Sequence, residues 1–165
     1  MDPRIAKAED ENFMRLAIAL GEKAALVDGT GGPFGCVIVK DGAVIAEGSN
    51  HVLTENDPTW HGEMAAIRAA GKSLGTFNLA GCTLYTSGEP CPMCAGAIFW
   101  ARIARVVYAS TIADALVYGG FDDQPIYEDL AKPIADRHVP AAQCLHEEML
   151  ELWRRYATKP DKIYY

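Results

Sequence analysis

The chain has 165 residues, half of them hydrophobic, and a formal net charge of −7 at pH 7. This length suits one domain, and because no long apolar run interrupts the sequence we expect a soluble globular protein rather than a membrane protein. The acidic balance argues against a nucleic-acid partner, since phosphate binding draws on clustered lysine and arginine, and it favours a small-molecule substrate.

The start of the chain carries no charged segment followed by an apolar stretch, so nothing in it marks the protein for export. Five cysteines are present, and two of them, in a C-x-x-C spacing, are needed as thiolates. Thiolates need a reducing environment. We therefore expect a cytoplasmic protein.

The chain up to residue 48 predicts one helix and one β-hairpin, and a second helix is predicted to follow at 63–70. Apolar residues recur with a helical period from Glu9 to Val27, and a glycine-rich stretch at 29–35 ends this pattern. Two apolar runs, 35–40 and 43–48, flank Asp41-Gly42. An Asp-Gly pair supplies the left-handed residues of a tight reversal, so these runs are predicted to pair as a hairpin.

The second half predicts an alternation of strands and helices. Residues 82–86 and 104–110 look like short buried strands, and residues 91–100 look like a helix between them. Such an alternation indicates a βαβ crossover and an α/β fold. Further helices are predicted at 113–118, 126–131 and 144–156. Because no repeat or long linker divides the sequence, residues 1–165 are predicted to be a single domain.

Two short motifs carry the chemistry of this chain. One is His61-Gly62-Glu63, and the other is Pro90-Cys91-Pro92-Met93-Cys94. One histidine and two cysteine thiolates fill three positions of a tetrahedral zinc and leave the fourth for water, whereas a structural zinc site is closed by a fourth protein ligand. The predicted metal ligands are therefore His61, Cys91 and Cys94, with Glu63 left as the catalytic proton carrier.

The local sequence explains how these side chains could meet. On a regular helix His61 and Glu63 would point about 200° apart, so both reach one pocket only from the start of a helix. Pro58 and Thr59 are candidates for the turn and the cap before that helix. Cys91 and Cys94 are three residues apart and share a helical face, next to the positive helix end that lowers a cysteine pKa.

Other interpretations of the cysteines remain open from the residues alone. A lone C-x-x-C could be a redox pair or half of a structural zinc knuckle. Cys36 or Cys82 could serve as a fourth ligand and close the site, although both stand in apolar, strand-like runs typical of buried core. A zinc-binding interaction module without catalytic activity would explain the ligands but not the free carboxylate of Glu63.

The paired motifs are the signature of zinc nucleobase deaminases, and the whole chain resembles the cytidine deaminase-like superfamily. Within it the chain is most similar to the bacterial guanine deaminases, on the runs 31–35, 56–59, 85–87, 89–94 and 121–123. The resemblance implies a three-layer α/β/α sandwich with a five-stranded mixed sheet and one zinc per chain. It also implies a homodimer in which C-terminal segments, about 144–165, are exchanged.

The resemblance implies hydrolytic deamination of guanine to xanthine and ammonia. Glu63 would take a proton from water and return it to the ring nitrogen and to the departing ammonia. The alternatives are a deaminase of guanosine, cytosine, cytidine or an amino-triazine, or a tRNA adenosine deaminase, which shares the metal motifs. The chain also departs from the family, since Trp60 stands where a small residue is usual and Gly62 where alanine is more frequent.

Several further residues are candidates for binding the substrate. Asn50 matches the family's base-binding asparagine, although it could be a turn residue. Asp123, and after it Asp122, match the acidic residue expected at guanine's polar edge, although either could cap a helix. Phe34 and Trp100 could stack on a planar ring or belong to the core. The resemblance implies that a terminal aromatic residue, Tyr164 or Tyr165, covers the site of a partner subunit, whereas the default interpretation of a chain end is a frayed terminus.

Overall fold

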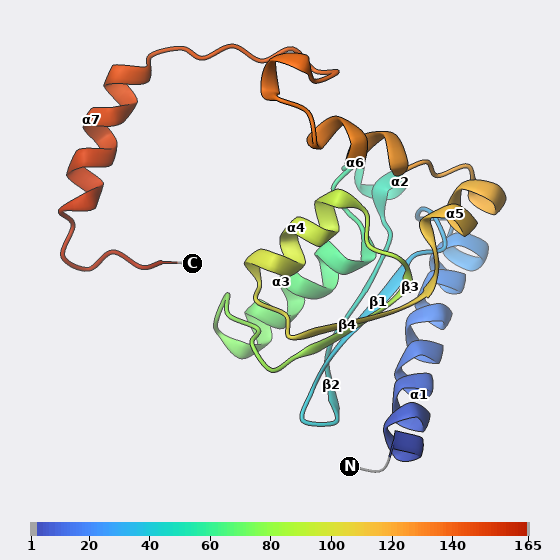
Figure 1. Cartoon of the computed structure of the whole chain (residues 1–165). Helices are drawn as coiled ribbons and strands as arrows, with labels where there is room; N and C mark the ends of the chain where they lie inside the picture. Colours follow the sequence, from blue (N-terminus) through green and yellow to red (C-terminus); the bar gives the residue numbers. More distant parts are fainter. Residues whose placement is uncertain (1–2, 165) are drawn as a thin grey trace. The chain divides into compact units, whose positions relative to one another are not determined.

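The computed structural model describes residues 3–164 (Figure 1). The chain divides into two compact units, Met1–Asp123 and Gln124–Tyr165. Among the described residues, no helix combines the length and the apolar character needed to cross a membrane.

The first unit is built on a mixed four-stranded sheet in the order β2-β1-β3-β4. β1 (Gly35–Lys40) pairs antiparallel with β2 (Ala43–Ser49) on one side and with β3 (Thr83–Gly88) on the other. β4 (Arg105–Ser110) runs parallel to β3. This parallel pair is joined through α4 (Pro92–Trp100), so the predicted βαβ crossover is confirmed.

The expected fifth strand is wrong: the sheet of the described chain has four strands. Short helices follow β4 as far as residue 136, and no residue of the stretch 137–145 has a ladder partner among the described residues. Pro140 stands in that stretch and lacks the N–H that a ladder needs.

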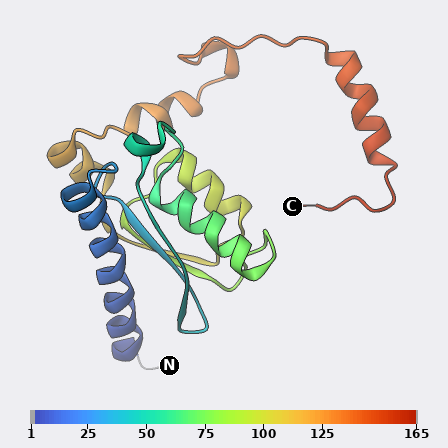
Figure 2. The same cartoon turned by 180° about the vertical axis from the view of Figure 1, so that it is seen from behind.

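Helices cover both faces of the sheet, which confirms the three layers (Figures 1 and 2). α1 (Pro3–Glu22) packs on β1 and β3, where Ala17, Val37 and Tyr85 are buried together. α3 (Gly62–Leu74) covers β1 and β2 on the opposite face, next to α4. The larger core lies on this second side, around Ile38 and Leu84.

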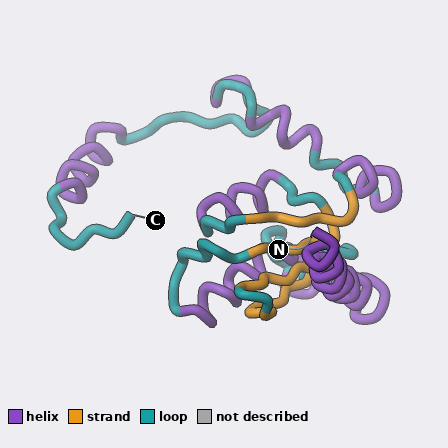
Figure 3. The backbone as a smooth tube through the Cα atoms, turned by 60° about the horizontal axis from the view of Figure 1, so that its bottom comes forward, coloured by secondary structure: helices purple, strands orange, loops and turns teal. Residues whose placement is uncertain are grey.

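The hairpin and most helices lie close to where the sequence predicts them. Figure 3 shows the helices in purple and the strands of the sheet in orange. Asp41 and Gly42 both have positive φ, 51° and 78°, as the tight reversal requires. The predicted first helix begins earlier, at residue 3, and ends in a π-helical turn, η1 (Lys23–Asp28). The remaining helices of the first unit are α2 (Val52–Glu55), which the sequence did not predict, α5 (Ile112–Asp114) and η2 (Ala115–Gly119).

The second unit contains α6 (Gln124–Leu130), η3 (Ile134–Asp136) and α7 (His146–Ala157). α6 and α7 correspond to the last two predicted helices. No described residue of this unit is buried. The unit therefore has no core of its own.

Candidate metal and substrate site

Two helices of the first unit begin at residues that carry metal-binding side chains. His61 is the N-cap of α3, with extended backbone angles of −79° and 156°. Cys91 is the N-cap of α4, with angles of −65° and 169°. The sequence predicts His61 at the start of a helix but suggests Thr59 as its cap, whereas Thr59 hydrogen-bonds to Asp57 instead.

The ligand atoms of His61, Cys91 and Cys94 all lie within 4.8 Å of one another. Nδ1 of His61 is 3.6 Å from each of the two sulfur atoms. A tetrahedral zinc with Zn–N and Zn–S bonds of about 2.0 and 2.3 Å would separate nitrogen and sulfur by about 3.5 Å. The three residues therefore fit a zinc ion in both chemistry and spacing.

The two thiols of this cluster are unequal in acidity. A hydrogen bond from Cys94 lowers the pKa of Cys91 to about 4. The same interaction, together with burial, raises the pKa of Cys94. The hydrogen bond with Cys91 is also the main reason that the pKa of His61 is raised. The pair thus shares a proton, which a divalent cation displaces when both thiolates become ligands.

Glu63 lies one residue beyond the start of α3 and is only 5% exposed. Burial raises the pKa of its carboxyl group, because a charge is costly away from water. Its Oε1 accepts a hydrogen bond of 3.2 Å from the hydroxyl of Thr86 on β3. A buried carboxyl group beside a metal cluster is suited to carrying a proton.

Close backbone packing fixes the position of α3. A Cβ atom on Gly48 of β2 would lie 2.2 Å from the carbonyl oxygen of Gly62 and 2.5 Å from the backbone nitrogen of Ala66. A Cβ on Gly62 itself would lie 3.0 Å from the carbonyl oxygen of Phe34. The helix start therefore rests directly on the strands, which gives a physical reason for glycine at position 62.

A cavity of about 380 Å³ opens onto the metal cluster. Six of the residues singled out from the sequence line it, and they lie in the first unit: Phe34, Asn50, His61, Glu63, Cys91 and Asp123. Sequence reasoning missed the other lining residues, which are Gly31, Gly32, Val52, Leu53, Pro58, Glu89 and Phe121. The only signal for Glu89 and Phe121 was their place inside runs typical of the family.

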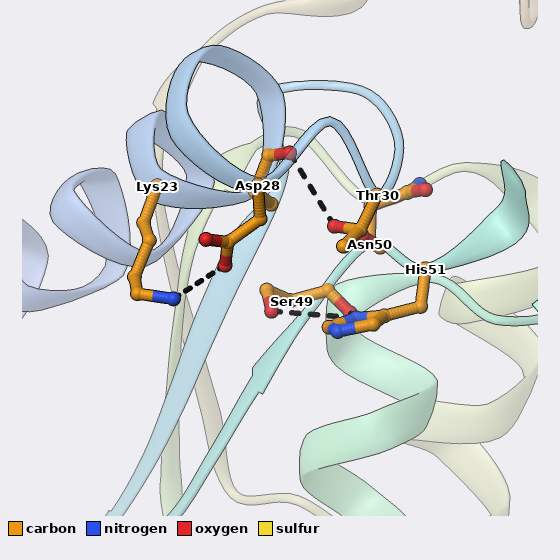
Figure 4. Close-up of polar contacts among 7 residues, drawn as sticks. Lys23, Asp28, Thr30, Ser49, Asn50 and His51 are labelled. Carbon is orange, nitrogen blue, oxygen red and sulfur yellow. Dashed lines mark hydrogen bonds and ion pairs between the residues drawn. The ribbon is translucent and has the colours of Figure 1, made fainter. Parts of the chain in front are cut away.

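Asn50 lines the cavity, is buried, and is held by hydrogen bonds from Val52 and Thr30. Its side-chain Oδ1 accepts a hydrogen bond of 3.1 Å from the N–H of Val52. Its backbone carbonyl accepts one of 2.7 Å from the hydroxyl of Thr30, and Figure 4 shows Thr30 and Asn50 next to each other. The turn interpretation and the binding interpretation of Asn50 are therefore compatible. The amide NH₂ supplies donors that the contact with Val52 does not use.

An aromatic pair and two carboxylates complete the cavity wall. Phe34 and Phe121 meet edge to face, with ring centroids 5.0 Å apart. Burial, and after it the charge of Cys91, raises the pKa of Asp123. Glu89 accepts a hydrogen bond of 3.1 Å from the N–H of Ile112 through Oε2. The cavity thus offers an apolar aromatic surface together with hydrogen-bond acceptors.

The other residues predicted to bind substrate are not among those that line this cavity. Trp100 is 61% exposed at the end of α4, and Asp122 is exposed beside Asp123. Tyr164 belongs to the second unit, and Tyr165 lies outside the described residues. Their roles stay predictions.

Trp60 faces a second cavity, apart from the metal cluster. This cavity has a volume of about 230 Å³ and is also lined by Leu20, Glu47 and His51. The ring of Trp60 lies 6.3 Å from that of His51. Trp60 adjoins the metal ligand His61 in sequence but is not among the residues that line the cavity at the metal cluster.

Cys36 and Cys82, considered as possible fourth ligands, are completely buried in the larger core, with Ile38 and Leu84. Neither belongs to the group of ligand atoms around His61. Within the described residues the cluster therefore has three protein ligands, as an open, catalytic zinc site requires.

Comparison with known proteins places these features in a family. Residues 7–110, more than half of the chain, match the model of the cytidine and deoxycytidylate deaminase zinc-binding region. Guanine deaminase from Bacillus subtilis is 50% identical over 154 residues, which cover 92% of this chain and 97% of that protein. Its X-ray structure matches with a TM-score of 0.89 and covers 94% of this chain and 98% of the other.

More distant relatives share the fold and most of the first unit. A structure of guanine deaminase from Nitrosomonas europaea is 30% identical, with a TM-score of 0.64, and covers 76% of this chain and 75% of the other. A tRNA-specific adenosine deaminase from Haemophilus influenzae is 40% identical over 113 residues, which cover 67% of this chain and 64% of that protein.

Proposed function

The chain belongs to the cytidine and deoxycytidylate deaminase family of zinc-binding proteins, and from this premise we propose that it deaminates free guanine to xanthine and ammonia. One observation carries the proposal. A cluster of His61, Cys91 and Cys94 opens into the same cavity as the buried carboxyl group of Glu63. That combination is what hydrolytic removal of an amino group from a heterocycle requires.

The zinc, when bound by these three residues, supplies the Lewis acidity that makes water a nucleophile near neutral pH. Glu63 accepts the proton of the attacking water and delivers it to the ring nitrogen of the base. The same carboxyl group then assists the departing amine. A C–O bond forms at C2 and the C–N bond to the amino group breaks, so guanine and water give xanthine and ammonia.

The cavity matches the polar edges of guanine, which present both a carbonyl acceptor and N–H donors. The amide NH₂ of Asn50 is suited to the acceptor, and the carboxylates of Asp123 and Glu89 are suited to the donors. Phe34 and Phe121 provide an apolar surface for the flat ring. From the family resemblance we add Trp100, Asp122 and the terminal tyrosines Tyr164 and Tyr165 as further substrate contacts.

We also propose that the enzyme is a cytoplasmic homodimer that exchanges its C-terminal segments, about 144–165. Support comes from the second unit, in which no described residue is buried although Leu152, Trp153 and Tyr156 are large and apolar. Apolar residues without a core of their own need another surface to cover them. A reducing compartment suits the free thiols of the cluster.

Ammonia release from a panel of substrates tests the proposed reaction. The panel contains guanine, guanosine, adenine, cytosine, cytidine, an amino-triazine and tRNA. We expect guanine to have the highest kcat/KM. A higher value for cytidine or guanosine would reject the choice of base, whereas turnover of tRNA alone would favour the related adenosine deaminases, against the acidic charge of −7.

Variants of two carboxyl groups test the assigned roles. Glu63→Gln keeps the shape of the side chain but removes its proton-carrying capacity, so zinc content should persist while kcat falls by at least about 10²-fold. Asp123→Ala should lower kcat/KM for guanine more than it lowers kcat/KM for any panel substrate that lacks guanine's N–H edge. Glu55→Gln is the control and should retain full activity, because Glu55 is exposed at the end of α2 and is not among the residues that line the cavity.

A further inference from the structure

Resting on the proposed function, we propose that Thr86 is a positioning residue, which fixes one oxygen of Glu63 so that the proton is carried on the other. The contact is between the Thr86 hydroxyl and Oε1 of Glu63, at 3.2 Å. Thr86 is only 1% exposed and Glu63 only 5%. Water therefore competes little with this hydrogen bond.

The donor in this contact is rigidly held. Thr86 lies in β3, an interior strand of the sheet, where it is paired with Cys36 on one side and Tyr108 on the other. A β-branched side chain in a strand has restricted rotation about χ1. The hydroxyl oxygen is consequently a fixed point, while Glu63 has a longer side chain with more rotatable bonds.

The chemistry of the hydroxyl group decides which carboxyl oxygen moves the proton. A threonine hydroxyl carries one hydrogen, and here that hydrogen is directed at Oε1. A proton placed on Oε1 would compete with it, whereas a proton placed on the second oxygen, Oε2, leaves the contact intact. Proton transfer from water to Glu63, and from Glu63 to the ring nitrogen, then uses Oε2 throughout, and the side chain need not rotate between the two steps.

The contact also connects the two halves of the metal cluster. Glu63 follows His61 at the start of α3, and Thr86 lies on the strand that leads to Cys91 and Cys94. The hydrogen bond between them therefore fixes Glu63 relative to both cysteine ligands. Loss of the hydroxyl should disturb the position of Glu63 without removing a metal ligand.

The first test compares Thr86→Val, which keeps the shape and loses the donor, with Thr86→Ser, which keeps the donor. Thr86→Val should lower kcat by about tenfold or more, since a hydrogen bond to a charged group is lost. KM should stay within about threefold and zinc content should not change. Thr86→Ser should recover most of kcat. The matched control is Thr83→Val on the same strand, away from the cavity, which should leave kcat unchanged.

A double-mutant cycle separates positioning from a general effect on packing. In a Glu63→Gln background, where no carboxyl group carries the proton, Thr86→Val should reduce the residual kcat by less than about twofold. A full tenfold loss in both backgrounds would mean that Thr86 acts independently of Glu63, and would overturn the inference.

A spectroscopic measurement provides a readout that does not depend on turnover. Infrared difference spectra of zinc-loaded protein with ¹³C-labelled glutamate, wild type minus Glu63→Gln, isolate the carboxyl bands of Glu63. Thr86→Val should shift these bands and Thr86→Ser should not. Unchanged bands in Thr86→Val would overturn the inference even if no panel substrate were turned over. An inactive wild type with shifted bands would instead reject only the proposed function.

Discussion

The imidazole of His61 and the carboxyl group of Glu63 face one cavity although only Gly62 separates them. Two residues on a regular helix would diverge by about 200°. The geometry works because His61 is the N-cap and keeps an extended backbone, while Glu63 already belongs to the first turn. One change of backbone conformation therefore gives the cluster both a metal ligand and a proton carrier.

The role of the cysteine ligands is tested by comparing two Cys→Ala variants. Cys91→Ala removes one of three ligands, so we expect the purified protein to lose most of its zinc together with its activity. Cys144→Ala makes the same chemical change at an exposed cysteine outside the cluster and should retain both. Metal analysis and ammonia release, measured on the same samples, compare the zinc content and the activity of the two variants. Full zinc occupancy in Cys91→Ala would contradict the three-ligand assignment.

At the residue scale the sequence predicts the metal ligands well and the cavity wall less well. His61, Cys91 and Cys94 are recognisable because zinc chemistry restricts both their identity and their spacing. Glu89 and Phe121 reach the cavity through tertiary packing, which no local spacing reveals. Trp60 shows the converse, because it adjoins a ligand in sequence yet lines a different cavity.

Among the elements, α3 depends on close packing, because its first turn lies against β2 at Gly48. A methyl group on Gly48 would overlap the backbone of Gly62 and Ala66, which cannot move without moving the helix. We expect Gly48→Ala to destabilise the protein by about 2 kcal/mol or more and to weaken zinc binding, since His61 begins this helix.

Gly96→Ala provides the control for that substitution. Gly96 lies within α4, and a Cβ there would meet no atom within 4 Å. Alanine is the better helix former, so this variant should be neutral or more stable by up to about 1 kcal/mol. Denaturant unfolding of zinc-loaded protein measures both variants. Equal stability of the two would show that α3 can shift without cost.

A polar cluster attaches α1 to the opposite face of the sheet. Asp10 accepts hydrogen bonds from Arg105 of β4, at 2.8 and 2.5 Å, and from Tyr85 of β3, at 2.7 Å. The Arg105 contact is the main cause that lowers the pKa of Asp10 below its ordinary value. Burial raises the pKa of Tyr85 to about 12, so this residue stays a donor.

The lowered pKa predicts how stability depends on pH. Because the folded carboxyl group is the stronger acid, its contribution is complete above its ordinary pKa near 4 and is lost as the pH falls through the lower, folded value. Asp10→Asn should therefore cost about 1 kcal/mol at pH 7, a figure reduced by the exposure of Arg105, and progressively less as the pH falls below the ordinary pKa near 4. Unfolding at several pH values, with the exposed Glu9→Gln as control, measures this difference. A pH-independent cost would assign the effect to packing.

The secondary structure of the first unit is largely predictable because its signals are local. Asp41-Gly42 fixes the hairpin through backbone conformation, and the helical period from Glu9 to Val27 reflects burial of one face. The number of strands is not a local property. A fifth strand was inferred from resemblance alone, and the local sequence offers it no support: Pro140, in the stretch at 137–145, lacks the N–H that a ladder needs.

At the scale of the whole molecule, the two units differ in how they could be stable. The first has cores on both faces of its sheet, whereas no described residue of the second is buried. A segment of this size without a core depends on another surface for its stability. The proposed exchange of C-terminal segments would provide that surface and would place the terminal tyrosines at the partner's cavity.

The tail itself can be tested by deleting residues 163–165. If these residues cover the site, the deletion should leave a folded, zinc-loaded dimer whose kcat/KM for guanine falls by at least about tenfold, since a cover excludes water and completes the site. Tyr164→Phe and Tyr165→Phe separate the contribution of each hydroxyl group from that of its ring. Unchanged kinetics in the truncated protein would mean that the tail has no part in catalysis.

Mixed dimers decide whether the tail acts on its own subunit or on the partner. Truncated chains with intact Glu63 are unfolded and refolded with full-length Glu63→Gln chains in equal amounts, so that about half of the dimers contain one chain of each kind. A tail that acts on the partner completes one of the two sites in each mixed dimer, and activity should return to about a quarter of the wild-type value. A tail that acts on its own subunit completes none, because every intact tail then covers a site without the carboxylate. Activity that stays at the level of the separate variants would therefore reject the exchanged arrangement while leaving the zinc chemistry untouched.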